Sequence, residues 1–118
     1  MSLTPGQIAE AFSRHRFSAA YPDLSPNVRW NSVGGELLVG RDAVIAKCDD
    51  LAQYLSTVST TFSHVETTAG ANHVVVESVA TYTESNGEVS TVASCDIYRF
   101  ADEQIMAIVS YNIEIPPS

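Results

Sequence analysis

Asp96 is the residue of this chain with the clearest capacity for acid–base chemistry. Between Glu88 and Arg99 it is the only carboxylate in a segment otherwise made of small, apolar and hydroxyl-bearing side chains. Burial there would raise the pKa of its carboxyl group, and a protonated carboxyl can donate a hydrogen bond to a ligand carbonyl. The same group could instead accept hydrogen bonds and anchor a helix to a sheet. A ligand-facing role and a structural role are therefore both open.

His15 is the second candidate, as a base near the mouth of the same site. It ends a predicted helix, where a cation suits the helix dipole, and a solvated helix-end histidine is the alternative. His64 and His73 fall at strand edges or turns and have no predicted role. The histidines and the distant Cys48 and Cys95 form no zinc-ligand pattern, so we expect no metal and no cofactor. The cysteines are predicted to be buried thiols, with one disulfide left open.

Aromatic and polar side chains could form the walls of a pocket around Asp96. Strand alternation places Trp30 on the same side as Ser32, and Tyr98 on the same side as Asp96. Aromatic walls with a few polar groups are typical of small-molecule sites, although ordinary core packing explains the same residues. Tyr82 is predicted at an interface or rim. The predicted ligand-binding residues are Phe12, Trp30, Ser32, Tyr54, Asp96, Tyr98 and Ser110.

Two helices are expected to position these side chains. Thr4 before Pro5, with Gln7 three residues after Thr4, predicts a capping box that opens a helix running to about residue 15. Residues 41–56 carry apolar side chains at helical spacing and predict the strongest helix of the chain. Residues 17–26 between them predict a connector that contains a helical turn.

The remaining segments predict strands. They are rich in Thr, Val and Tyr and are separated by turn residues, with Asn86-Gly87 as a hairpin signal. The predicted strands cover 28–32, 37–39, 58–69, 73–84, 88–100 and 104–115. Helices come first and an antiparallel meander follows, so the predicted class is α+β, with helices packed on the concave face of a curved antiparallel sheet.

The last strand predicts a second buried surface. Alternation assigns its side chains to two faces, Ile105, Ala107, Val109, Tyr111 and Ile113 on one and Met106, Ile108, Ser110 and Asn112 on the other. Helices can cover only one face, and an exposed apolar patch usually marks an interface. The sequence therefore predicts a homodimer through the convex sheet face, with Ile97, Val109 and Tyr111 near its centre.

Composition and charge limit the classes of partner. The 118 residues are 45% hydrophobic and 17% charged, which is typical of one globular domain, expected over 4–115. A formal net charge of −8 would repel phosphate backbones and anionic lipid surfaces, so neither nucleic acid nor a membrane is an expected partner. No spanning segment or signal peptide is evident, and we expect a cytoplasmic location.

The order of elements resembles the cone-shaped α+β fold shared by nuclear transport factor 2, ketosteroid isomerase, limonene epoxide hydrolase and the SnoaL-like polyketide cyclases. The resemblance covers about residues 4–115. It is carried by Val28-Arg29-Trp30 before a Gly-Gly turn, Gly40-Arg41-Asp42-Ala43-Val44 opening the long helix, Cys95-Asp96-Ile97-Tyr98-Arg99-Phe100 before a turn, and Ile105 in the last strand. Such a fold implies a pocket between the helices and the concave sheet.

The resemblance assigns only one of the family's acidic groups to this chain. Asp96 falls where ketosteroid isomerase has its oxyanion-hole Asp, but Ser32 or Asn31 falls at the general-base Asp. The Asp-Arg-Asp set of limonene epoxide hydrolase falls on Ser78, Ala80 and Ser110. Ser110 also falls at the catalytic Asp of the polyketide cyclases.

Two functions follow from these residues and this resemblance. The first is binding of a small apolar or amphipathic molecule, with metal-free isomerase, cyclase or dehydratase chemistry next to a carbonyl if the protein is an enzyme. Asp96 would then polarise the carbonyl oxygen or move the proton. The alternative is a non-catalytic dimerisation or protein-interaction module with a vestigial pocket. An open cavity would favour the first function, and a cavity plugged by side chains would favour the second.

Overall fold

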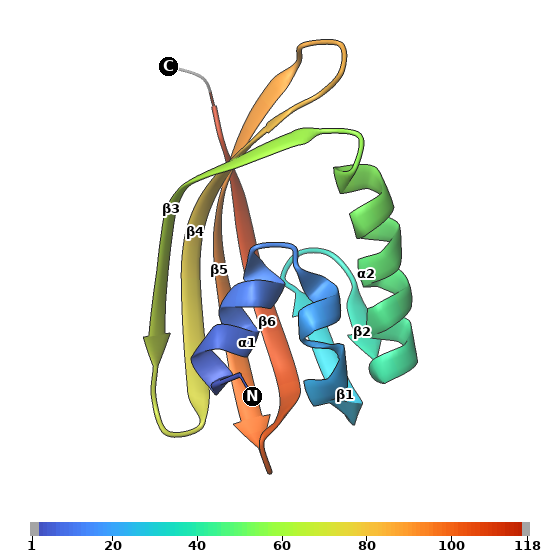
Figure 1. The fold of residues 1–118 in the computed structure, drawn as a ribbon, viewed down its shortest axis with the longest axis vertical. Helices are drawn as coiled ribbons and strands as arrows, with labels where there is room; N and C mark the ends of the chain where they lie inside the picture. Colours follow the sequence, from blue (N-terminus) through green and yellow to red (C-terminus); the bar gives the residue numbers. More distant parts are fainter. Residues whose placement is uncertain (1–2, 117–118) are drawn as a thin grey trace.

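The computed structural model describes residues 3–116 and confirms the α+β class (Figure 1). Its helical elements are α1 (Pro5–Ser13), η1 (Phe17–Ala19), η2 (Tyr21–Asp23) and α2 (Arg41–Leu55). Its strands are β1 (Leu24–Ser32), β2 (Leu37–Val39), β3 (Ser59–Ala69), β4 (His73–Thr83), β5 (Val89–Ala101) and β6 (Gln104–Ile115). The helix α1 lies against the concave face of the sheet, and α2 flanks β1 and β2.

The six strands form one sheet in the order β2-β1-β6-β5-β4-β3. The hairpin-connected neighbours pair antiparallel, as predicted, but β1 pairs with β6 in parallel. The sheet is therefore mixed. Parallel neighbours need a long crossover connection, and here β2, α2 and three strands lie between the two partners. Turn residues indicate only local partners, which is why the sequence did not predict this pairing.

The start of β1 also differs from the prediction. The segment 17–26 was expected to be a connector, but it forms two 3-10 turns and then enters the sheet at Leu24. Leu24 pairs with Ile105 and is fully buried, as is Val28 on the same strand. Burial of these two side chains stabilises an extended segment that begins four residues before the predicted strand 28–32.

A bulge in β6 changes the predicted faces of that strand. Phe100 pairs with Ile105 whereas Arg99 pairs with Ala107, so Met106 is an extra residue in the ladder. As a result Ile105 lies in the core together with Ile108, both fully buried. The assignment of Ile105 to the face of Val109 and Tyr111 was therefore wrong, because strict alternation does not hold across a bulge.

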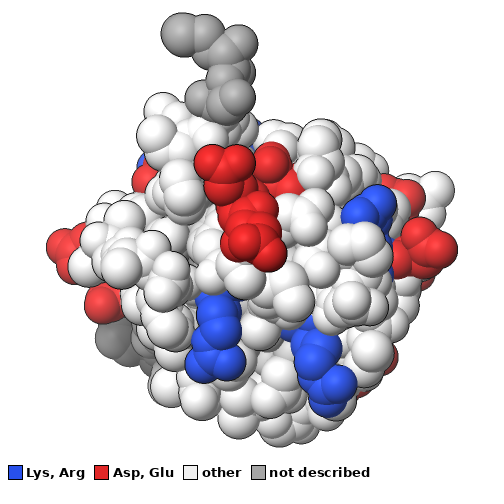
Figure 2. All heavy atoms as spheres, turned by 90° about the horizontal axis from the view of Figure 1, so that it is seen from below, with Lys and Arg blue, Asp and Glu red and all other residues white. Residues whose placement is uncertain are grey.

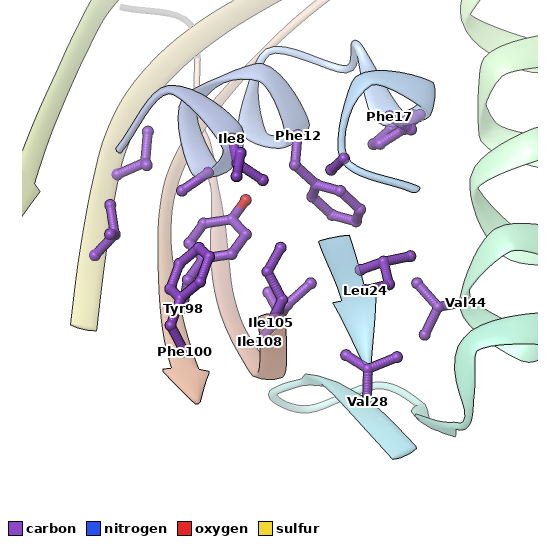
Figure 3. Packing of buried hydrophobic residues seen from close by; sticks show 14 of the residues in the cluster. Ile8, Phe12, Phe17, Leu24, Val28, Val44, Tyr98, Phe100, Ile105 and Ile108 are labelled. Atoms are coloured by element: carbon purple, nitrogen blue, oxygen red, sulfur yellow. The ribbon is translucent and has the colours of Figure 1, made fainter. Parts of the chain in front are cut away.

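The core between α1 and the sheet is built on aromatic contacts (Figure 3). The ring of Phe12 packs edge-on against Phe17 and Trp30, with centroid distances of 5.1 Å in both cases, and lies 6.0 Å from Tyr98. Buried Val44 on α2 packs in the same cluster. Full burial of side chains of this size contributes about 1.5–3 kcal/mol each, which fixes α1 and α2 on the sheet.

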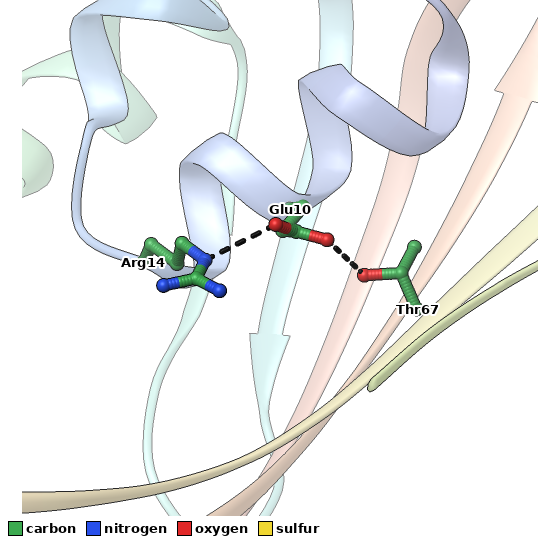
Figure 4. A network of polar contacts seen from close by, with 3 residues as sticks. All are labelled: Glu10, Arg14 and Thr67. Atoms are coloured by element: carbon green, nitrogen blue, oxygen red, sulfur yellow. Dashed lines mark hydrogen bonds and ion pairs between the residues drawn. The ribbon is translucent and has the colours of Figure 1, made fainter. Parts of the chain in front are cut away.

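A polar contact holds the outer side of α1 to the edge strand β3 (Figure 4). The carboxylate of Glu10 accepts a hydrogen bond from Thr67 Oγ1 at 2.7 Å and pairs with Arg14 Nε at 3.1 Å. The Thr67 hydroxyl is the main reason why the pKa of Glu10 is lowered. The predicted capping box is confirmed at the start of α1, where the Gln7 amide donates to Thr4 Oγ1 at 3.1 Å.

On the face of the molecule seen from below, the positive charges do not form one patch (Figure 2). In the view from below, basic side chains stand apart from one another with uncharged surface between them (Figure 2). None of the helices within residues 3–116 is long and apolar enough to cross a membrane.

Candidate functional site

A cavity of about 230 Å³ lies between the helices and the concave face of the sheet. A cavity of about 150 Å³ is enough to bind benzene, so this one has room for a small organic molecule. Its apolar wall is aromatic and includes Phe12, Phe17, Trp30 and Phe62. Its polar wall includes Ser13, His15, Ser78, Tyr82, Asp96 and Ser110. The cavity is therefore open rather than plugged by side chains.

Among residues 3–116, Asp96 is the one carboxylate in the wall of this cavity. Ser13 Oγ on α1 donates a hydrogen bond to Asp96 Oδ2 at 2.8 Å, and Ser110 lies opposite Asp96 in the β5–β6 ladder. Burial raises the pKa of Asp96, and this effect outweighs the hydroxyls of Ser110 and Ser13, which lower it. The environment therefore favours the protonated carboxyl group, which can donate a hydrogen bond.

Tyr98 lies beneath the cavity and not in its wall. Its ring is fully buried under α1 (Figure 3). Its hydroxyl lies 2.6 Å from Ser13 Oγ. Because the single Ser13 proton is donated to Asp96, the Tyr98 hydroxyl must donate to Ser13. The three groups form a chain of hydrogen bonds that ties α1 to β5. The structural role that the sequence left open for Asp96 is thus present alongside its place in the cavity.

Trp30 and Ser110 meet at another part of the wall. The indole Nε1 of Trp30 donates to Ser110 Oγ at 3.0 Å. Ser32, two residues further along β1, was predicted to share this wall but does not line the cavity. It lies at the end of β1, where the chain turns back and the Gly35 amide donates to the Ser32 carbonyl.

The cap at the C-terminal end of α1 determines the backbone conformation of His15. The helix stops at Ser13, two residues earlier than predicted, and His15 has a φ of 68°. The His15 amide donates to the Phe12 carbonyl and the Arg16 amide to the Ala11 carbonyl, the pattern of a Schellman cap. Glycine usually occupies this left-handed position, so a histidine here costs backbone strain.

The imidazole of His15 pairs with Tyr82. Its Nε2 lies 2.8 Å from the Tyr82 hydroxyl, and its ring also packs near Phe17 and Phe62. Burial lowers the pKa of His15, which favours the neutral ring. Burial and the charge of Asp96 raise the pKa of Tyr82. Tyr82 was predicted at an interface or rim. The even-numbered residues of β4 from Val74 onward face the cavity, so strand alternation could have predicted that Tyr82 lines it.

The structure thus brings together five of the predicted site residues, Phe12, His15, Trp30, Asp96 and Ser110. Tyr54 is exposed on α2 and lines a neighbouring cavity, with its hydroxyl donating to Glu84 Oε1 at 3.1 Å. Sequence reasoning missed Ser13 and Phe62 as well as Tyr82. Nothing in the local sequence of Ser13 marks it, because its partner Asp96 lies 83 residues away.

No group of three or more metal-ligating side chains occurs among residues 3–116. Cys48 and Cys95 are both free thiols, the first buried on α2 and the second half-buried on β5.

Replacing Ser13 by Ala should destabilise the protein and change Asp96. The variant leaves the buried Tyr98 hydroxyl without its partner, so we expect the free energy of unfolding to fall by about 1–3 kcal/mol. It also removes a hydrogen bond that favours the Asp96 carboxylate, so the pKa of Asp96 should rise further. Urea unfolding and a carboxyl-carbon NMR titration measure the two effects. Ser18→Ala, at an exposed hydroxyl, is the control, and equal behaviour of both variants would contradict the hydrogen-bond chain.

The SnoaL-like domain family matches residues 7–108 of the chain. Comparison with curated proteins finds no match. Among solved structures, the chain is similar to a nuclear transport factor 2-like protein of unknown function from Cytophaga hutchinsonii. The two share 31% identity and a TM-score of 0.79, over 90% of this chain and 93% of the other.

Two more distant structures share the fold. An LEH-like epoxide hydrolase from M. tuberculosis has 15% identity and a TM-score of 0.65, over 92% of this chain and 81% of its own. A protein with a ketosteroid isomerase-like fold from Catenulispora acidiphila, in complex with trimethylamine, has 17% identity and a TM-score of 0.67, over 92% of this chain and 86% of its own.

Proposed function

Because the chain belongs to the SnoaL-like family, we propose that it binds a small amphipathic carbonyl compound in the cavity beside Asp96 and catalyses metal-free proton transfer next to that carbonyl. The observation that carries this proposal is a desolvated carboxyl group in a cavity whose other lining side chains are uncharged apolar and polar groups, most of them aromatic or hydroxyl-bearing. Protonated Asp96 donates a hydrogen bond to the carbonyl oxygen. This contact stabilises the negative charge that develops on the oxygen when a neighbouring carbon loses its proton.

We propose His15 as the base that takes this proton. Burial keeps the imidazole neutral, as a base must be. In the tautomer whose Nε2–H donates to Tyr82, Nδ1 is free to accept a proton. In a substrate with a carbon–carbon double bond next to the deprotonated carbon, the proton then returns to a different carbon, so that the double bond moves and no atoms are gained or lost.

Hydrogen exchange tests the proposal directly. The protein is incubated in D₂O with 2-butanone or 2-pentanone, and NMR follows both deuterium incorporation next to the carbonyl and the indole signal of Trp30, the only tryptophan in the chain. We expect exchange faster than in buffer together with a shift of the indole signal. A shift without exchange would overturn the catalytic part of the proposal. Absence of both would overturn the binding part as well and favour a non-catalytic module.

We also propose that two copies of the chain pair through the convex face of the sheet. Tyr111 is 45% exposed and Ile113 68% exposed on this face, next to half-buried Val109. Ile97 and Cys95 on β5 extend the same surface, since they pair with Val109 and Tyr111. An apolar surface of this extent is typical of an interface.

A further inference from the structure

A second cavity of about 210 Å³ adjoins the one that contains Asp96. We call the cavity at Asp96 the inner chamber and this one the outer chamber. Four residues line both chambers, namely His15, Phe17, Leu51 and Tyr82. The hydrogen-bonded pair of His15 and Tyr82 therefore lies at the junction of two neighbouring spaces.

The two chambers differ in chemistry. The inner chamber contains Asp96 and several serine hydroxyls, whereas the described part of the chain places no carboxylate, Lys or Arg in the wall of the outer chamber. The outer chamber adds Leu55 and Tyr54 to the shared side chains. The Tyr54 hydroxyl is engaged by Glu84 Oε1 at 3.1 Å, so what this residue offers to the chamber is its ring. Polarity is thus concentrated at the inner end of the combined space.

We propose that the two chambers form one elongated site for a carbonyl compound with an unbranched apolar tail. The carbonyl occupies the inner chamber at Asp96, and the tail passes the His15–Tyr82 pair into the outer chamber. This inference rests on the proposed function and adds the shape of the ligand to it. A cavity of about 150 Å³ holds the six carbons of benzene, so the outer chamber has room for a tail of about six carbons.

The proposal predicts how affinity depends on chain length. Dissociation constants of 2-alkanones from 2-butanone to 2-decanone can be measured from the Trp30 indole signal, which reports on the inner chamber. Each methylene that enters the outer chamber should tighten binding about fourfold, which corresponds to the burial of one CH₂ group. Affinity should stop rising once the tail fills the chamber.

A variant that fills only the outer chamber separates this inference from the proposed function. Ser90 lines the outer chamber but not the inner chamber. Ser90→Phe should therefore abolish the gain in affinity that the long ketones show, while 2-butanone binds as before. Val89→Phe is the matched control, because Val89 is exposed and its side chain points to the other face of β5.

The affinity measurements distinguish a failure of the elongated site from a failure of the proposed function. If 2-butanone binds but affinity does not change with chain length, or if Ser90→Phe and Val89→Phe bind the long ketones alike, the elongated site is overturned. The binding part of the proposed function then stands. If no ketone shifts the Trp30 signal, both are overturned.

Discussion

Asp96→Asn should slow the exchange of protons next to a ligand carbonyl by about 10²-fold or more, while the protein remains folded. Loss of one donor to a developing oxyanion costs about 10²–10³-fold in rate, and the amide of asparagine is a much weaker acid than a carboxyl group and stabilises this charge less. The asparagine can still accept the hydrogen bond from Ser13 that the carboxylate accepts at 2.8 Å. The expected loss is therefore one of chemistry and not of structure.

The stability of the same variant should depend on pH in a defined direction. The pKa of Asp96 is raised in the folded protein above its ordinary value of 3.8. The folded state then binds more protons than the unfolded state, so the free energy of unfolding of the wild type falls as pH rises from about 3.8 through the folded value. Asp96→Asn lacks this titration. It should therefore gain stability relative to the wild type as the pH approaches neutrality.

Thermal melts of both proteins between pH 4 and 8, with a carboxyl-carbon NMR titration of Asp96, measure this difference. Asp50→Asn, at an exposed position of α2, makes the same chemical change away from the cavity and should leave the rate of exchange unchanged. The residue would instead be assigned to anchoring α1 if the pKa of Asp96 were depressed and Asp96→Asn lowered the free energy of unfolding by about 1–3 kcal/mol.

Features fixed by neighbouring residues were predictable from the sequence. The capping box at Thr4 and Gln7 and the helix Arg41–Leu55 were found because capping and helical periodicity involve residues a few positions apart. The parallel partner of β1 was not predictable, since its selection depends on β6, the last strand of the chain. Nor was the bulge at Met106, which no glycine marks.

The site was predictable to the extent that strands alternate. Alternation placed Asp96 and Trp30 in the cavity wall, but it placed Tyr98 there as well, on the same face as Asp96. Tyr98 is instead covered by α1, whose Ser13 accepts its hydrogen bond. Asp96 and Tyr98 lie on one face of β5, and tertiary packing decides which of them α1 covers. No local sequence pattern predicts this choice.

Val109→Asp should convert a dimer of this protein into monomers. Specific dimers bury roughly 800 Å² per partner, and the proposed convex face is centred on Val109, Tyr111 and Ile97. A carboxylate at this centre would be buried without a partner when two chains associate. This burial disfavours association by more free energy than the loss of the Val109 methyl groups does. Val109 is half-buried in the single chain, so the monomer should tolerate the change.

Light scattering at tens of micromolar protein gives the mass of each species, and the melting temperature of the wild type should rise with concentration if folding and pairing are coupled. Gln53→Glu adds one negative charge on the exposed side of α2 and should leave the dimer intact. A wild type that is monomeric at this concentration would contradict the interface. A variant that stays dimeric would move the interface elsewhere, for example to the exposed Leu37 and Val39 of the edge strand β2.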